Sequence, residues 1–176
     1  LPKGVLNIVH GLGTSTGQAI VEHPNIKAIS FTGGTKTGAH IASIAAPMFK
    51  KLSLELGGKN PNIIFADCDY DKMLETTVRS SFANQGQICL CGSRIFVEEK
   101  IYEKFKKDFI QKVSELKVGN PSEKNTNIGA LVSKQHLEKV KSYIDLTTQE
   151  NAEILFGGNR VVVKNSENGY YLQPTN

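Results

Sequence analysis

Two residues of the chain, Cys89 and Glu55, could carry covalent chemistry if the fold exposes them. Cys89 follows the polar, glycine-containing residues 84–87, and such surroundings can leave a nucleophilic thiolate accessible. Free cysteines are more often small core residues, so composition alone favours the interpretation that Cys89 and Cys91 are buried on either side of Leu90. A zinc site is disfavoured, because this pair supplies at most two ligands and no other His or Cys pair has a suitable spacing.

Glu55 is a candidate general base. Residues 51–56 alternate between polar and apolar types, which predicts a strand with three leucines on one face and Glu55 on the other. A carboxylate in that position is most often simply solvated. Gly57 and Gly58 follow directly, and glycines at the carboxyl end of a strand allow a ligand to approach the backbone closely.

Two glycine-rich turns could bind phosphate groups. Residues 11–13 and residues 33–38 each lead into a predicted helix, and the N–H groups at a helix N-terminus favour anions. Neither turn has the GxGxxG spacing of a dinucleotide-binding fingerprint in a convincing register. Ordinary glycine turns are therefore an equal alternative.

The elements that would position these residues follow from the hydrophobic pattern. Strands are predicted at residues 5–9, 28–31, 51–56, 62–65, 94–98, 153–156 and 170–173. Helices are predicted at residues 17–22, 36–46, 70–84, 102–116 and 137–144. Successive strand–turn–helix units favour a parallel α/β sheet. The break at Gly57 and Gly58 predicts two domains, residues 1–57 and residues 58–176.

Length and charge limit the classes of protein to consider. The chain has 176 residues, a hydrophobic content of 39% and a net charge of +4 without a block of like charges, so we expect neither a nucleic-acid nor a membrane partner. Three cysteines and no secretion signal predict reduced thiols and a cytoplasmic location. The chain opens on Leu1 and ends without a closing helix, so we expect an internal fragment of a longer protein.

Three segments in order resemble the aldehyde dehydrogenase superfamily. They are FTGGT at residues 31–35, LELGGKNP at residues 54–61 and NQGQIC at residues 84–89. The resemblance runs from residue 1 to residue 175 through further segments at residues 92–94, 118–121, 128–131 and 169–175. Within the superfamily, residues 50–61 and 80–91 look most similar to the 2-aminomuconic semialdehyde dehydrogenases.

The resemblance implies an α/β fold in two parts and a role for each candidate residue. Residues 1–57 would be the C-terminal part of a Rossmann-like NAD(P)-binding domain, and residues 58–176 an incomplete α/β catalytic domain. Cys89 would attack the aldehyde carbonyl to form a thiohemiacetal and then a thioester. Glu55 would activate the water that hydrolyses this thioester to a carboxylic acid.

The resemblance also implies a cofactor site and an assembly. Gly33 and Gly34 would hold the pyrophosphate, with Leu56 and Gly57 beside the nicotinamide ring. The cofactor would be NAD, with NADP left open, and no metal is expected. The partners would be a small aldehyde and further copies of the full-length protein. Further cofactor residues of the family, and the residue that completes its oxyanion hole, fall outside this chain, so we expect the isolated chain to be inactive.

Two other classes of function are alternatives to aldehyde oxidation. A non-catalytic structural or binding relative would keep the fold, but it would have no physical need for both Cys89 and Glu55. A cysteine hydrolase would need a histidine base. The four histidines, His10, His23, His40 and His136, are not obviously placed for that role, although residues distant in the sequence can meet in space.

Overall fold

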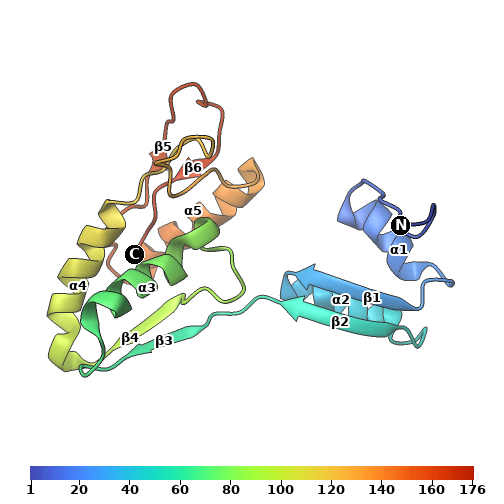
Figure 1. Cartoon of the computed structure of the whole chain (residues 1–176), viewed down its shortest axis with the longest axis horizontal. Coiled ribbons are helices and arrows are strands. Elements are labelled where there is room, and N and C mark those ends of the chain that lie inside the picture. Colours follow the sequence, from blue (N-terminus) through green and yellow to red (C-terminus); the bar gives the residue numbers. More distant parts are fainter. The chain divides into compact units, whose positions relative to one another are not determined.

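The structure is a computed structural model that describes all 176 residues. They form two compact units, Leu1–Gly58 and Lys59–Asn176. The ribbon of each unit can be followed in Figure 1. The strands of the first unit pair only with each other, and so do those of the second. Assigning the predicted domains 1–57 and 58–176 to nucleotide binding and to catalysis stays a prediction.

The first unit is a two-stranded parallel sheet with helices. Its elements are a π-helical turn (Gly13–Gly17), α1 (Gln18–Glu22), β1 (Ala28–Gly33), α2 (Thr35–Ala45) and β2 (Lys51–Leu56). Strands β1 and β2 are parallel, as the strand–turn–helix pattern predicts, and α2 connects them. A Cβ on Gly38 of α2 would lie 2.5 Å from Leu56 Cδ2, so a glycine there allows the helix to pack closely on β2.

The strand predicted at residues 5–9 is wrong. These residues form turns and irregular backbone, and the side chains of Leu6 and Val9 are 69% and 65% exposed. An apolar run becomes a strand only when a neighbouring strand accepts its backbone hydrogen bonds. In this unit β1 pairs only with β2, so residues 5–9 have no such partner.

A buried lysine joins the first helix to the start of β2. Lys50 is 8% exposed, and its Nζ donates hydrogen bonds to the carbonyl oxygens of Val21 and His23, the latter at 2.8 Å. Both carbonyls lie at the C-terminal end of α1, where backbone oxygens have no partner within the helix. The ammonium group therefore satisfies the helix end and anchors it beside the sheet.

The second unit combines short strands with three long helices. Its elements are β3 (Pro61–Ile64), α3 (Tyr70–Phe82), a 3₁₀ turn (Ala83–Gly86), β4 (Arg94–Val97), α4 (Glu99–Ser114), α5 (Lys134–Gln149), β5 (Arg160–Val161) and β6 (Tyr171–Leu172). Strands β3 and β4 are parallel, whereas β5 and β6 are antiparallel. The main core lies between β3, α3 and α4 and contains Ile64, Leu74, Val78, Phe105, Phe109 and Val113. A smaller cluster contains Leu131, Leu137 and Leu172.

The strand predicted at residues 153–156 is also wrong, because the short strand β5 forms at Arg160–Val161 instead. The N–H groups of Leu155 and Phe156 donate to a single residue, Asn176, whose carbonyl oxygen lies 2.8 and 3.2 Å away. One facing residue does not make a ladder. Strand β5 forms where a matching partner exists, with Arg160 opposite Leu172 of β6.

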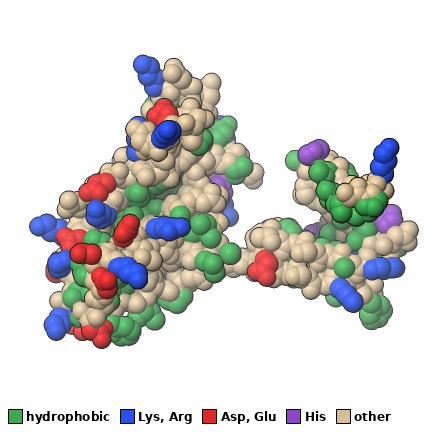
Figure 2. Space-filling model, viewed as in Figure 1, with side chains coloured by type: hydrophobic (Ala, Val, Ile, Leu, Met, Phe, Trp, Pro, Cys, Tyr) green, Lys and Arg blue, Asp and Glu red, His purple; other side chains and the backbone are tan.

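A polar cluster on the surface joins α3 to α4. Tyr70 Oη and Lys104 Nζ both donate to Asp108 Oδ2, at 2.8 and 2.9 Å, and the ammonium group lies 3.2 Å from the centre of the Tyr70 ring. The hydrogen bonds from Lys104 and then Tyr70 lower the pKa of Asp108. On the face of the second unit in view, Figure 2 shows acidic and basic side chains interspersed, without a patch of one sign.

The aromatic centre of the main core should dominate the stability of the second unit. Phe109 is 4% exposed, and its ring stacks on Phe105 at a centroid distance of 5.1 Å. We expect Phe109→Ala to lower the free energy of unfolding by about 3–5 kcal/mol, because it removes a buried ring and leaves a cavity. Tyr102→Ala on the same helix, at a residue 45% exposed, should cost far less. Equal losses in urea denaturation would contradict this core assignment.

Candidate active site

Cys89 lies in a tight turn just after α3. The backbone first passes through three consecutive residues with positive φ, Asn84 (50°), Gln85 (55°) and Gly86 (68°). Residues other than glycine rarely adopt this conformation. The Cys91 N–H then donates to the Ile88 carbonyl oxygen at 2.9 Å. Cys89 is thus a central residue of a four-residue turn.

The turn separates the two neighbouring cysteines. Cys89 is exposed and Cys91 is buried, with 6% of its surface accessible. Leu90 between them is 79% exposed. The interpretation of the pair as core residues is therefore correct for Cys91 and wrong for Cys89. Of the two thiols, only that of Cys89 is open to a molecule in solution.

Three side chains from other segments hold the loop that carries Cys89. The Asn60 amide donates to the carbonyl oxygens of Cys89, at 2.6 Å, and Cys91, at 3.2 Å. Ser80 Oγ accepts from the Gly92 N–H and Ser81 Oγ donates to the Gly92 carbonyl oxygen, both at 3.1 Å. The sequence prediction assigned no role to Asn60 or to the two serines, although all three lie in segments that carry the resemblance.

The positive-φ segment has its own support. With its amide oriented so that both polar atoms are satisfied, Gln85 accepts a hydrogen bond from the Gly129 N–H at 3.1 Å and donates to the Asn84 carbonyl oxygen at 2.9 Å. A Cβ on Gly129 would lie 3.1 Å from the Gln85 side chain. A glycine at position 129 therefore permits this close approach to the backbone before Cys89.

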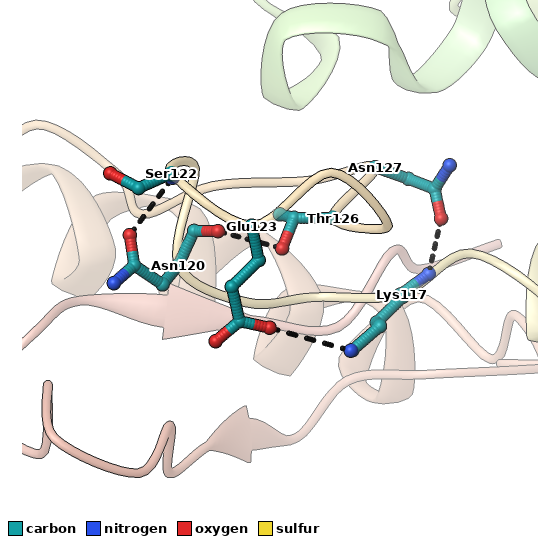
Figure 3. A network of polar contacts seen from close by, with 6 residues as sticks. All are labelled: Lys117, Asn120, Ser122, Glu123, Thr126 and Asn127. Carbon is teal, nitrogen blue, oxygen red and sulfur yellow. Dashed lines mark hydrogen bonds and ion pairs between the residues drawn. The ribbon is translucent and has the colours of Figure 1, made fainter.

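The loop that leads to Gly129 is braced by the polar network in Figure 3. The Lys117 N–H donates to Asn127 Oδ1 at 2.8 Å, and Thr126 Oγ1 donates to the Asn120 carbonyl oxygen at 2.7 Å. Lys117 Nζ also lies 3.5 Å from Glu123 Oε2. These contacts join the two sides of the loop at residues 117–127. The loop leads directly to Gly129, the residue that Gln85 contacts.

In the first unit, the remaining candidate residues meet at one edge of the sheet. Glu55 is exposed near the end of β2 and lies opposite Thr32 of β1. Gly33 lies opposite Leu56 in the same register, and Gly57 follows. This is the edge formed by the carboxyl ends of two parallel strands, where ligands of open α/β sheets bind. None of the four ion pairs of the chain uses the Glu55 carboxylate.

The start of α2 fits a phosphate-containing cofactor. Gly34 precedes the helix, whose N-terminus has no side-chain cap and no acidic residue in its first turn. A Cβ on Gly34 would meet nothing within 4 Å, so the space beside this residue is open. A Cβ on Gly33 would instead lie 2.5 Å from the Phe31 ring. The helix terminus can therefore receive an anionic group.

Each candidate residue thus has a definite local setting. Gly33, Gly34, Glu55, Leu56 and Gly57 lie together in the first unit, while Cys89 lies in the second. The chain has no group of three His, Cys, Asp or Glu side chains that could hold a metal ion. None of its helices is both long enough and apolar enough to span a bilayer.

Comparison with known proteins gives concordant results. A sequence profile of the aldehyde dehydrogenase family matches residues 1–175. The chain is 50% identical to the 2-aminomuconic semialdehyde dehydrogenase of Mus musculus, over 99% of this chain and 37% of that protein. It is 45% identical to the 2-aminomuconic 6-semialdehyde dehydrogenase of Pseudomonas sp, over 99% of this chain and 36% of the relative.

A solved structure with the same fold adds a second kind of similarity. The betaine aldehyde dehydrogenase of Staphylococcus aureus, crystallised in complex with NAD+, superposes with a TM-score of 0.94 and 38% sequence identity. The similarity covers 99% of this chain and 35% of that one. The chain therefore spans little more than a third of the length of these three proteins.

Proposed function

Because the chain belongs to the aldehyde dehydrogenase family and has part of its α/β fold, we propose that the complete protein oxidises an aldehyde to a carboxylic acid with NAD. The observation that carries the proposal is the exposed Cys89 thiol, presented by a braced turn beside a buried Cys91. The family match over residues 1–175 supports the same chemistry. A non-catalytic relative would not need an exposed nucleophile held in this way.

Cys89 acts first in the proposed mechanism. Its thiolate attacks the carbonyl carbon of the aldehyde, a C–S bond forms, and the carbonyl oxygen becomes the oxyanion of a thiohemiacetal. The backbone N–H of Cys89 donates to this oxyanion, so the charge develops next to a donor already in place. When NAD is bound, its nicotinamide would be the oxidant that accepts the hydride from the former aldehyde carbon. A thioester on Cys89 remains.

Glu55 acts in the second half of the reaction. Its carboxylate takes a proton from water, the resulting hydroxide attacks the thioester carbonyl, and the C–S bond breaks. The proton passes from Glu55 to the departing sulfur, so the products are a carboxylic acid and the free Cys89 thiol, and the Glu55 carboxylate is restored. The exposed position of Glu55 and its freedom from ion pairs support this role, because the base must reach water and must not be neutralised by a fixed cation.

For the cofactor, we propose that the backbone at Gly33 and Gly34 holds the pyrophosphate of NAD in front of α2. Leu56 and Gly57 would lie beside the nicotinamide, since Leu56 ends β2 opposite Gly33. Support comes from the open, uncapped N-terminus of α2 and from NAD+ in the crystals of the betaine aldehyde dehydrogenase. NADP is the alternative, because the residues with which the family grips the adenosine ribose fall outside this chain.

For the substrate, we propose 2-aminomuconic semialdehyde. The support is the 50% identity to proteins named for that substrate in Mus musculus, Homo sapiens and Bos taurus. A homo-oligomer of the complete protein and a cytoplasmic location are further proposals, which light scattering and cell fractionation can test.

The proposed activity predicts NADH formation that depends on both the aldehyde and the enzyme. The complete protein should produce one NADH for each carboxylic acid released, and kcat/KM for 2-aminomuconic semialdehyde should exceed that for betaine aldehyde. Absorbance at the NADH band with parallel product analysis checks both points. An acid released without NADH would indicate hydrolysis instead of oxidation. A higher kcat/KM for betaine aldehyde would contradict the proposed substrate but not the proposed class of reaction.

A further inference from the structure

Asn60 has a double contact that the proposed mechanism does not yet use. Its single amide nitrogen donates to two carbonyl oxygens of the same loop, at 2.6 Å on Cys89 and 3.2 Å on Cys91. The amide lies 29 residues away from Cys89 in the sequence. Both hydrogens of the NH₂ group are therefore committed to the turn that carries the thiol.

The donor is itself held in place. Asn60 directly precedes Pro61, and a residue before proline is restricted to extended backbone. Its carbonyl oxygen accepts from the Arg94 N–H at 3.2 Å, and Arg94 Nε donates to the Lys59 carbonyl oxygen at 3.0 Å. The amide thus projects from a fixed point at the start of the β3–β4 sheet.

The same contacts act on the backbone next to the Cys89 groups that the chemistry needs. Cys89 is a central residue of the turn closed by the Cys91 N–H and the Ile88 carbonyl oxygen. On its N-terminal side lie the left-handed residues Asn84 and Gln85 of the 3₁₀ turn. Fixing the carbonyls of Cys89 and Cys91 fixes the peptide planes on the C-terminal side of the thiol. These planes restrict the backbone torsions at Cys89, and so they restrict the directions that its side chain and its N–H can take.

We infer that Asn60 is a positioning residue for the nucleophile, acting through the carbonyl oxygens of Cys89 and Cys91 and not by contact with the substrate. This inference rests on the proposed role of Cys89. It assigns a mechanistic task to the Asn60 amide that a merely stabilising side chain would not have: the NH₂ group holds the thiol and the oxyanion donor in the geometry for attack.

Asn60→Asp is the sharpest variant, because it keeps the size of the side chain and replaces the donor by an acceptor that faces two carbonyl oxygens. In rapid-mixing experiments on the complete protein, the first-turnover rate constant for NADH formation should fall about 10²-fold, the cost typical of a misplaced reacting group. The KM for NAD should stay unchanged, since Gly33 and Gly34 are untouched. Asn60→Ser, which retains one donor, should recover part of the rate.

Asn62→Asp is the matched control. Asn62 lies two residues further along the chain, in β3, and its amide donates to Thr77 Oγ1 at 3.1 Å. The Thr77 hydroxyl can donate in return to a carboxylate, so this variant should stay close to wild type in the first turnover. Equal loss in both aspartate variants would overturn the inference, because it would show a general effect on the unit. A wild-type rate in Asn60→Asp would overturn it as well.

Hydrogen exchange separates this inference from the proposed function. The N–H groups of Cys91 and Gly92 are both hydrogen-bonded in the loop. In Asn60→Asp they should exchange at least roughly tenfold faster, because the two hydrogen bonds from Asn60 to this loop are lost. If the wild-type protein oxidised no aldehyde, the proposed function would fail. The exchange rates would still decide: unchanged protection at Cys91 and Gly92 would show that Asn60 does not hold the loop.

Discussion

Cys89→Ser should lower aldehyde oxidation by the complete protein by roughly 10⁴- to 10⁶-fold, the range seen when a covalent enzyme loses a member of its catalytic unit. A serine hydroxyl occupies nearly the same space but is not ionised at neutral pH, so it cannot replace the thiolate. The binding of NAD should persist, because the first unit is unchanged. Steady-state NADH formation and cofactor titration by fluorescence measure the two effects separately.

The other two cysteines provide the controls. Cys91 lies only two residues from Cys89, but its thiol is buried, and Cys91→Ala removes it. Cys68→Ala removes a partly buried thiol. Both variants should retain most of the activity. Iodoacetamide should modify Cys89 first in the wild-type protein, with activity lost in step. Inactivation that follows modification of Cys68 or Cys91 would remove Cys89 from the mechanism.

Glu55→Gln should separate the two chemical steps. The amide keeps the shape of the side chain but cannot take a proton from water, so thioester hydrolysis should slow by about 10²- to 10⁴-fold. Hydride transfer should suffer less if the Cys89 thiolate forms without this carboxylate. Rapid mixing should then show a burst of about one NADH per active site, followed by slow turnover, as expected when general-base loss affects only the second step.

Lys51→Gln is a suitable control for Glu55→Gln. Lys51 is exposed on the same strand, four residues before Glu55, and the change removes a charge without touching the proposed base. It should leave both the burst and the steady-state rate near wild type. If Glu55→Gln turned over at the wild-type rate, Glu55 would not be the general base and would be only a solvated carboxylate. Loss of the burst itself would show that Glu55 also activates the thiol.

The elements around Glu55 could be predicted from the sequence because they depend on local pattern. The alternation in residues 51–56 defines both the strand and its exposed face, and the structure has β2 at those residues with the same alternation. Residues 5–9 show the limit of that approach. Their apolar pattern resembles that of a strand, but a strand also requires a neighbour, and residues close in sequence cannot reveal whether one exists.

The surroundings of Cys89 were beyond prediction for a different reason. Which cysteine of the Cys89–Cys91 pair is exposed depends on a turn that is fixed by distant groups, above all the amide of Asn60. The positive φ of Gln85 likewise depends on its contact with Gly129. Such contacts join residues 29 or more positions apart, and no periodicity encodes them. The family resemblance predicts that Cys89 is the nucleophile. Only the structure shows the hydrogen bonds that hold its loop.

In the proposed mechanism, Cys89 carries the acyl group between oxidation and hydrolysis. Peptide mass mapping can detect this intermediate in the complete protein as Glu55→Gln, quenched in acid after one turnover with aldehyde and NAD. The peptide that contains Cys89 should gain the mass of the acyl group, in an amount equal to the NADH of the burst, and should lose it on treatment with hydroxylamine. An acyl group on Cys68 or Cys91, or a full burst of NADH with every cysteine unmodified, would contradict the account.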